Sequence, residues 1–199
     1  MRIYILILLA LFSTNVFSQV EPPDTMINKG LYKSFYSRKQ GSPSFVVYKL
    51  YKGGGKNKRT GTFRKDVKKP FNYKGTGYHR GHLVAAEDFA YNKKLLDKTF
   101  YYSNVLPQKP KLNLGKWKSY ETKIRKLSQK DSLLIICGGY SWEKGIPEKC
   151  FKVVYSLTDG TCYYALMFDN GGNYEVSSGY HLDRAFPYRR FKHQVSLYK

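Results

Sequence analysis

The sequence predicts an α+β domain with a mostly antiparallel sheet and at least one long helix. Three observations support this prediction: apolar runs of strand length at residues 44–51 and 132–137, a hairpin pattern around Asp159-Gly160, and one segment with helical periodicity. Hydrophobic residues make up 42% of the 199 positions, which is enough apolar surface for a core and excludes a disordered chain. The length is typical of a single domain, and no internal repeat or linker divides it.

The N-terminal segment, residues 1–18, has the pattern of a secretory signal peptide. Arg2 precedes a short apolar run that ends at Phe12, and the small residue Ser18 stands at the expected cleavage point. The run is too short for a membrane-spanning helix, which needs about 20 apolar residues. We therefore expect one domain, residues 19–199, that is secreted or periplasmic and has no stable membrane association. A buried N-terminal helix or strand is the alternative interpretation.

The first half of this domain contains one predicted strand and two irregular segments. Residues 44–51 are rich in aromatic and β-branched side chains, which is typical of a strand. Residues 52–58 are rich in Gly and Lys and follow as a basic hairpin loop; they lack the Gly spacing and the Ser or Thr of a phosphate-binding loop. Residues 73–86 contain three glycines and are predicted to be irregular to extended.

The second half contains the predicted helix and the remaining strands. Apolar residues recur at steps of three and four in residues 114–127, which predicts an amphipathic helix. The residues of its apolar face are Leu114, Trp117, Tyr120, Ile124 and Leu127. Residues 132–137 are continuously apolar, as in a buried central strand, and residues 151–157 and 161–168 flank the Asp-Gly turn as a hairpin. The basic, aromatic segment from Tyr180 has no assignment.

The three cysteines are too few for a disulfide framework. Cys150 and Cys162 are the nearest pair in sequence and could form one bridge in an exported protein. Buried free thiols, with Cys137 as the third, are the alternative. The cysteine spacings do not match a zinc site.

The chain is strongly basic, with a net charge of +21. This charge predicts a polyanionic partner: nucleic acid, an anionic membrane or an acidic polysaccharide. A soluble basic surface without such a partner is the alternative. Basic residues flank the central polar segment at Lys56, Lys58, Arg59, Arg64, Lys65, Lys68, Lys69, Lys109, Lys111, Lys116 and Lys118.

Polar residues that suit chemistry concentrate between His79 and Glu121. Asn113, Trp117 and Glu121 stand four residues apart and share one helix face, where an amide oxygen and a carboxylate suit a hard cation. The alternative is that Asn113 caps the helix and Glu121 is a solvated surface charge. Trp117 fits the core under either interpretation.

A histidine side chain with a pKa near neutrality can take a proton from water, so His82 is a candidate general base. Gly81 before it permits tight backbone geometry or close approach of a substrate, and Arg80 offers a planar cation suited to phosphate. His79 and His82 could instead supply half of a zinc site. The Glu of the metalloprotease pattern and a third nitrogen or sulfur ligand are missing.

Several of these segments, in the same order, resemble the DNA/RNA non-specific endonuclease family, which includes secreted bacterial nucleases and mitochondrial endonuclease G. They are Tyr78-His79-Arg80-Gly81-His82-Leu83, Thr99-Phe100-Tyr101-Tyr102-Ser103-Asn104, Pro107-Gln108, Asn113-x3-Trp117 and Glu121. The resemblance covers residues 59–127 closely and extends more weakly to Phe168. It implies a ββα-metal (His-Me finger) nuclease fold and an endonuclease that hydrolyses DNA and RNA without sequence preference, using Mg²⁺ with Mn²⁺ as the alternative ion.

The resemblance also implies a role for each matching residue. His82 would be the general base that activates water, and Asn113 the single direct protein ligand of Mg²⁺, with water in the other positions. Glu121 would hold those waters, and Asn104 would support the site through hydrogen bonds. Arg80 would steady the substrate phosphate or the local loop.

An upstream arginine would stabilise the transition state; Arg59 fits best and Arg64 is the rival. The sequence departs from the family at His79, where Asp is usual. Because Asp at that position is neither base nor ligand, we expect activity to survive. A protonated imidazole of His79 could lower the pKa of His82, which leaves the pH optimum open. Two other functions remain open: a secreted nucleic-acid-binding protein without catalysis, and a protein that binds acidic polysaccharide or membrane.

Overall fold

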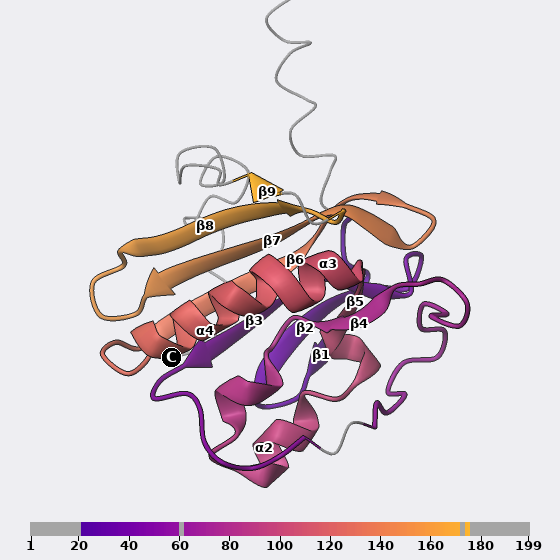
Figure 1. Ribbon diagram of the computed structural model, residues 1–199. Coiled ribbons are helices and arrows are strands. Elements are labelled where there is room, and N and C mark those ends of the chain that lie inside the picture. The colour runs from indigo at the N-terminus through magenta and orange to yellow at the C-terminus, as the bar shows by residue number, and fades with distance from the viewer. Residues whose placement is uncertain (1–20, 60–61, 172–173, 176–199) are drawn as a thin grey trace, which may run out of the picture.

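The computed structural model describes residues 21–59, 62–171 and 174–175. The predicted signal peptide and the segment from Tyr180 lie outside the described residues. Seven strands form one antiparallel sheet in the order β1-β2-β3-β6-β7-β8-β9 (Figure 1). Their bounds are β1 Thr25–Asn28, β2 Tyr32–Ser37, β3 Ser42–Leu50, β6 Leu133–Glu143, β7 Ile146–Ser156, β8 Cys162–Asp169 and β9 Tyr174–Glu175.

The predicted strands are confirmed. Of the two predicted strands, residues 44–50 fall in β3 and residues 133–137 fall in β6, the fourth of the seven strands. Strands β7 and β8 form the predicted hairpin, with Gly160 in the left-handed region at φ +82° that this turn requires. The continuous apolar run of β6 reflects burial on both faces of a central strand.

The register of that hairpin shows whether Cys150 and Cys162 can form a disulfide. Cys150 on β7 lies opposite Phe168, whereas Cys162 on β8 lies opposite Tyr155, so the two thiols sit at opposite ends of the ladder. Of the two alternatives for the cysteines, the Cys150–Cys162 bridge is therefore excluded. Both are free thiols, Cys150 buried and Cys162 exposed.

A second, two-stranded sheet and the long helix form a ββα unit. Strand β4 His79–His82 pairs with β5 Val105–Gln108, and the chain then enters α3 Pro110–Leu112, η3 Asn113–Trp117 and α4 Lys118–Leu127 without a break. The segment between the two strands contains η1 Ala86–Phe89, α2 Lys93–Lys98 and η2 Tyr102–Asn104. Figure 1 shows the long helix across one face of the large sheet, with β4 and β5 beside its first turns. Residues 73–86 are irregular to extended, as predicted.

The helix is confirmed, but its first turns differ from the prediction. It begins at Pro110, because proline is favoured in the first turn, and passes through one wide π-type turn in which Gly115 departs from helical geometry (φ −96°, ψ −110°). As a result Leu112 is buried, while Leu114 is 62% exposed and does not belong to the apolar face. Trp117 packs against Phe168 in the core between helix and sheet.

Residues 52–58 form a loop but not the predicted hairpin. Strand β3 pairs with β2 and β6, and the loop instead begins the long connection to β4. Its glycines allow it to lie against η1 and the end of α4: the Gly53 N–H donates to Ser128 Oγ (3.1 Å), and a Cβ on Gly55 would lie 2.1 Å from the Tyr91 nitrogen. Backbone packing therefore explains the glycine run.

Among the residues that the structure describes, none of the helices has the length and apolar character needed to cross a bilayer.

Candidate active site

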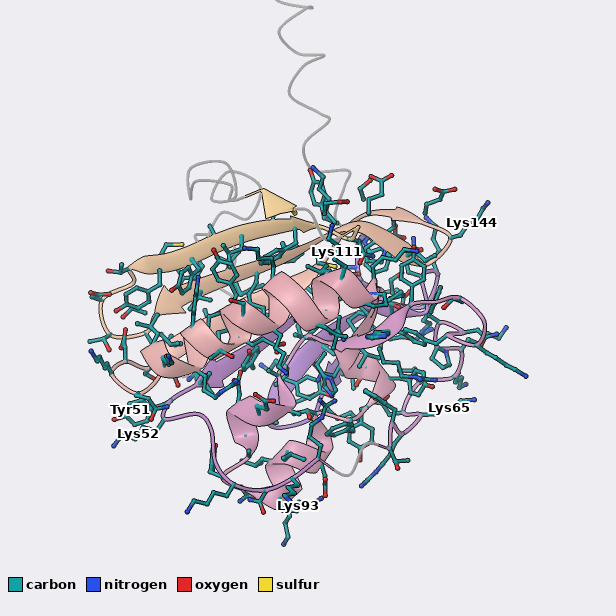
Figure 2. All side chains as sticks on the ribbon, in the orientation of Figure 1. Tyr51, Lys52, Lys65, Lys93, Lys111 and Lys144 are labelled. Carbon is teal, nitrogen blue, oxygen red and sulfur yellow. The ribbon has the colours of Figure 1, made fainter. Side chains whose placement is uncertain are left out.

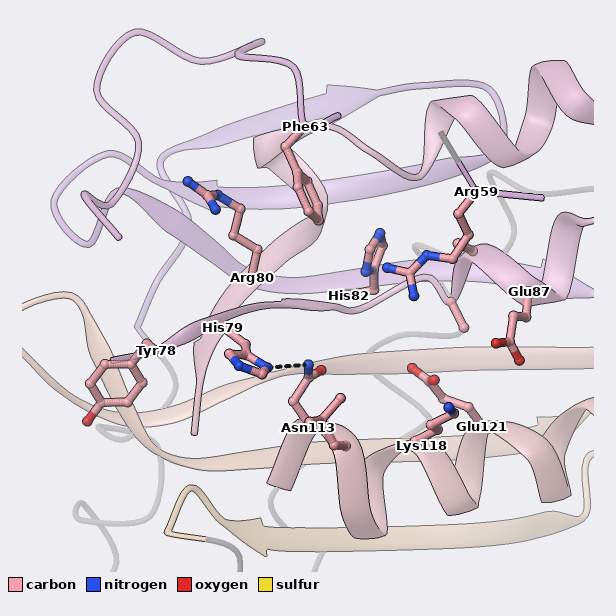
Figure 3. Close-up of a pocket in the computed structure, with 13 residues that line it drawn as sticks. Arg59, Phe63, Tyr78, His79, Arg80, His82, Glu87, Asn113, Lys118 and Glu121 are labelled. Carbon is pink, nitrogen blue, oxygen red and sulfur yellow. Dashed lines mark hydrogen bonds between the residues drawn. The ribbon is translucent and has the colours of Figure 1, made fainter. Parts of the chain in front are cut away.

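The ββα unit and the loop before it enclose a pocket of about 370 Å³. Five of the six predicted site residues line it: Arg59, Arg80, His82, Asn113 and Glu121. Figure 3 shows Asn113 and Glu121 projecting from the helix toward the opposite wall, which carries His82 and Arg59. The structure therefore brings together residues that lie up to 62 positions apart in the sequence.

His82, the last residue of β4, is held as a neutral imidazole. Its ring packs between Phe63 (5.1 Å between ring centroids) and Phe100 (4.9 Å). Burial, with a further contribution from the Arg59 charge, lowers the pKa of His82 to about 3. Its Nε2 is buried and has no hydrogen-bond partner in the described part of the chain. Its carbonyl oxygen accepts a hydrogen bond from Trp117 Nε1 at 3.0 Å, which ties the strand end to the helix.

Asn104 does not line the pocket but fixes the backbone directly after His82. The Asn104 side chain is buried, and its Oδ1 accepts the Val84 N–H at 2.9 Å. Its Nδ2 donates to the carbonyl oxygens of Val84 (3.0 Å) and Thr99 (2.9 Å). All the polar atoms of this buried amide are thereby paired, which makes the turn beyond His82 rigid.

Gly81 serves the pairing of β4 with β5. A Cβ at this position would lie 2.0 Å from Oε1 of Gln108, the buried side chain that occupies the space. The expectation that Gly81 leaves room for a substrate is thus wrong, because the room is filled by the neighbouring strand.

Asn113 and His79 form a pair at one side of the pocket. Asn113 Nδ2 lies 3.2 Å from His79 Nδ1, the dashed contact in Figure 3. With the amide nitrogen engaged there, Asn113 Oδ1 remains available to the pocket. The alternative that Asn113 caps the helix is wrong, since Lys109 occupies the cap position and Asn113 has helical dihedral angles.

Glu121 is not the solvated surface charge of the alternative interpretation. Its side chain is 16% exposed, and Oε1 lies 3.9 Å from the ammonium of Lys152. Burial raises the pKa of Glu121 to about 7, and the Lys152 charge opposes that rise. Glu121 therefore titrates near neutral pH and can accept hydrogen bonds from water in the pocket when it is ionised.

The two candidate arginines differ in position. The Arg59 guanidinium lines the pocket, 5.5 Å from the Phe100 ring centroid. Arg64 is not among the lining residues; its backbone N–H donates to the Phe100 carbonyl at 2.8 Å, and its guanidinium lies 6.0 Å from the Tyr101 ring centroid. Geometry thus favours Arg59 for contact with a bound phosphate.

Arg80 is exposed but held in place by aromatic rings. Its guanidinium lies 5.0 Å from the ring centroid of Tyr73 and 5.6 Å from that of Tyr102, and Nε donates to the Tyr102 hydroxyl at 3.2 Å. Stacking of this kind restrains the side chain and leaves the outer nitrogens free for an anion.

Several neighbours of these residues had no predicted role in the pocket. Phe63, Tyr78 and Lys118 line the pocket, and Lys152 lies beneath it. For Lys152 a signal was present, because it is the single charged residue of the predicted strand 151–157. Among the described residues, no group of three or more His, Cys, Asp and Glu side chains could hold a metal ion. The zinc alternative therefore finds no ligand set in this part of the chain.

Comparison with known proteins gives consistent results. The DNA/RNA non-specific endonuclease profile matches residues 13–198. Human mitochondrial endonuclease G is 42% identical over 67 residues, which are 34% of this chain and 23% of that protein. A nuclease of Nostoc sp. is 27% identical over 157 residues, 70% of this chain and 57% of that protein. The alignments thus span less than two thirds of these relatives' own length.

A solved structure supports the fold. The crystal structure of an EndoG/EndoGI complex superimposes with a TM-score of 0.66 and 21% identity, covering 83% of this chain and 85% of the other. The predicted ββα fold with a mostly antiparallel sheet is therefore confirmed.

Proposed function

Because the chain belongs to the DNA/RNA non-specific endonuclease family, we propose that it hydrolyses internal phosphodiester bonds of DNA and RNA without sequence preference. The observation that carries this proposal is the shared pocket, in which an imidazole and a guanidinium on one wall face an amide and a carboxylate on the other. These groups are the base, the cation ligand and the anion stabiliser that phosphodiester hydrolysis requires.

The donor set of the pocket fits a hydrated hard cation. Asn113 offers a single amide oxygen, Glu121 offers a carboxylate, and the cavity of about 370 Å³ leaves space for water. Mg²⁺ keeps much of its hydration shell and binds through few protein oxygens, so we propose Mg²⁺, with Mn²⁺ as a substitute. When bound beside Asn113, this ion would supply positive charge against the charge that develops on the phosphate.

In the proposed reaction His82 takes a proton from the attacking water. The low pKa of His82 keeps the imidazole unprotonated but makes it a weak base. A substrate phosphate next to Arg59 would offset the guanidinium charge that contributes to this low value. Binding of substrate therefore raises the pKa of His82 toward the range that suits a general base.

The other residues position the phosphate and the water. Arg59 donates hydrogen bonds to phosphate oxygens, and its charge matters most in the transition state, where charge accumulates. Arg80, restrained by its aromatic rings, fixes the strand on one side of the bond that is cut. Glu121 accepts hydrogen bonds from water in the pocket, and Asn104 holds the backbone that carries His82.

Charge explains the lack of sequence preference. Lysines project outward on several sides of the molecule, as the labelled Lys52, Lys65, Lys93 and Lys144 illustrate (Figure 2). Contacts between such side chains and phosphates add affinity for any nucleic acid and read no sequence.

We also propose that the protein is exported, on the basis of the signal-like pattern in residues 1–18. Cell fractionation followed by mass spectrometry of the mature N-terminus tests this directly. A mature chain that starts near Gln19 outside the cytoplasm is expected; an intact N-terminus on a cytoplasmic protein contradicts it.

The central test is a cleavage assay with plasmid DNA and RNA in Mg²⁺. We expect wild-type protein to degrade both, EDTA to stop the reaction, and His82→Ala to abolish turnover while DNA affinity and its salt dependence stay unchanged. Intact substrates over a wide pH range with Mg²⁺ or Mn²⁺ would refute the proposal. A gel shift without cleavage would instead identify a nucleic-acid-binding protein, the alternative that the basic charge supports.

A further inference from the structure

A lysine lies buried beneath the pocket and has no part in the proposed reaction. Lys152 belongs to β7 and is 1% exposed. Its partners across the sheet, Cys137 on β6 and Leu166 on β8, both belong to the apolar core under the helix. The Lys152 side chain therefore enters the layer between helix and sheet, where a charged group is costly to place.

The contacts of the ammonium group do not offset that cost well. Lys152 Nζ lies 3.9 Å from Glu121 Oε1 and 4.2 Å from the ring centroid of Trp117. Within the described residues it makes no hydrogen bond. A buried ion pair without good hydrogen bonds seldom stabilises a fold relative to apolar residues of similar size. Stability alone therefore does not explain a lysine at this position.

The position of Lys152 relative to the pocket offers a better explanation. Glu121 stands between the ammonium and the cavity, so the charge attracts the carboxylate from its buried side. The other charged groups around Glu121 have competing effects: Asp88 and Glu87 disfavour the carboxylate, whereas Arg125 favours it. Arg125 is itself engaged with both acids, with Nη2 2.8 Å from Glu87 Oε2.

A second contact of Lys152 leads toward the base. The Trp117 indole under the ammonium donates its Nε1–H to the His82 carbonyl oxygen at 3.0 Å. The ammonium of Lys152 thus contacts both the Glu121 carboxylate and the indole that holds the His82 carbonyl. Lys118 lines the same pocket from its exposed side.

We propose that Lys152 is a positioning residue of the active site, which holds the Glu121 carboxylate in place and directed into the pocket. This inference rests on the proposed nuclease function for its kinetic consequences, but the contact between Lys152 and Glu121 can be tested without turnover. Lys152 acts through Glu121 and touches neither substrate nor water in the pocket.

The kinetic test is a double-mutant cycle on a short oligonucleotide. Lys152→Met should lower kcat about 10- to 100-fold with a small change in KM, and Glu121→Gln should do the same. Because both act on one carboxylate, adding Lys152→Met to Glu121→Gln should change kcat less than about twofold. Lys152→Arg, which retains the charge, should keep more of kcat than Lys152→Met. The matched control is Glu143→Gln, which removes an exposed carboxylate that does not line the pocket and should leave kcat unchanged.

Two kinetic outcomes overturn the proposal: a Lys152→Met variant with kcat within about twofold of wild type, or equal losses from Lys152→Met in the wild-type and Glu121→Gln backgrounds. Circular dichroism and urea unfolding establish that each variant is folded. If Lys152→Met does not fold, two comparisons of kcat decide the question: Lys152→Arg with wild type, and the double variant with Glu121→Gln.

A second measurement separates this proposal from the proposed function. Crystal structures of metal-free wild type and Lys152→Met compare the direction of the Glu121 side chain. Loss of the nearby cation should turn the Glu121 carboxylate away from its wild-type position facing the pocket. A Glu121 side chain with unchanged direction overturns the role of Lys152 even if wild type is an active nuclease. A displaced side chain supports that role even if wild type cleaves nothing.

Discussion

Asn104→Asp offers a sharp test of how the site is built, because it exchanges one NH₂ group for an oxygen and leaves the shape unchanged. The retained oxygen can still accept the Val84 N–H. The new oxygen, if ionised, would face the carbonyl oxygens of Val84 and Thr99, to which the amide donates at 3.0 and 2.9 Å. Desolvation and two facing carbonyls both disfavour a carboxylate there, so the introduced carboxyl has a pKa well above its ordinary value.

The expected cost depends on pH. In the protonated form the hydroxyl can donate to one of the two carbonyls, and the other loses its partner, which costs about 1–3 kcal/mol. In the ionised form both carbonyls lose their donor and face a negative charge, so the cost rises to about 3–6 kcal/mol. Because the folded-state pKa is raised, the stability of the variant is retained below the unfolded-state value near 4 and is lost as pH rises above it.

Urea unfolding of wild type and variant at pH 5.0 and 7.5 measures this directly. We expect the difference in unfolding free energy to be larger at pH 7.5 by about 2 kcal/mol. Asn104→Ala is the control, since it removes the same hydrogen bonds without adding a titrating group and should show no such pH dependence. A cost for Asn104→Asp that is equal at both pH values, within about 0.5 kcal/mol, would refute the assignment of this amide as a buried, fully paired support.

Three further predictions concern the pocket itself. The pKa of His82 is about 3 in the folded protein and 6.5 in an unperturbed histidine, so between these pH values the unfolded chain binds one proton more than the folded chain. The unfolding free energy of the metal-free wild type, relative to that of His82→Ala, should therefore rise with pH from about 3 to 6.5. A difference that does not change with pH contradicts a buried neutral imidazole. His79→Ala removes the acceptor of the Asn113 amide and should raise the Mg²⁺ Kd, measured by calorimetry, about 3- to 10-fold; an identical titration would show that His79 does not orient Asn113. Arg59→Ala should lower kcat about 100- to 1000-fold, whereas Arg64→Ala should leave it nearly unchanged, and the reverse order would transfer the transition-state role to Arg64.

Local patterns of the sequence predicted strands β3, β6, β7 and β8 and the long helix. An apolar run as in β6, a turn signal as at Asp159-Gly160 and a helical period are properties of neighbouring residues, so the chain alone displays them. Strands β1, β2, β4 and β5 and helix α2 were not predicted. The ordered motifs around His82 and Asn113 identified candidate site residues, and the fold brings five of the six into one pocket.

Other features depended on contacts between distant segments. The glycines of residues 52–58 indicated a hairpin, but Gly53 packs closely against Leu50 and Asp88, and Gly55 packs against Ala90 and Tyr91. The nearest cysteines in sequence are separated by the register of β7 and β8. The wide turn at Asn113–Trp117 exposes Leu114, although the helical period predicted that it would be buried.

The sequence by itself therefore determined the central strands, the β7–β8 hairpin and the long helix, and it identified which side chains are chemically competent, because these follow from residue type and short-range spacing. Only the tertiary structure decided the charge states and supports of those side chains. The pKa of His82 is lowered by burial between Phe63 and Phe100, and that of Glu121 is raised by burial above Lys152. Desolvation and charge proximity are properties of three-dimensional neighbours, which the order of residues along the chain does not specify.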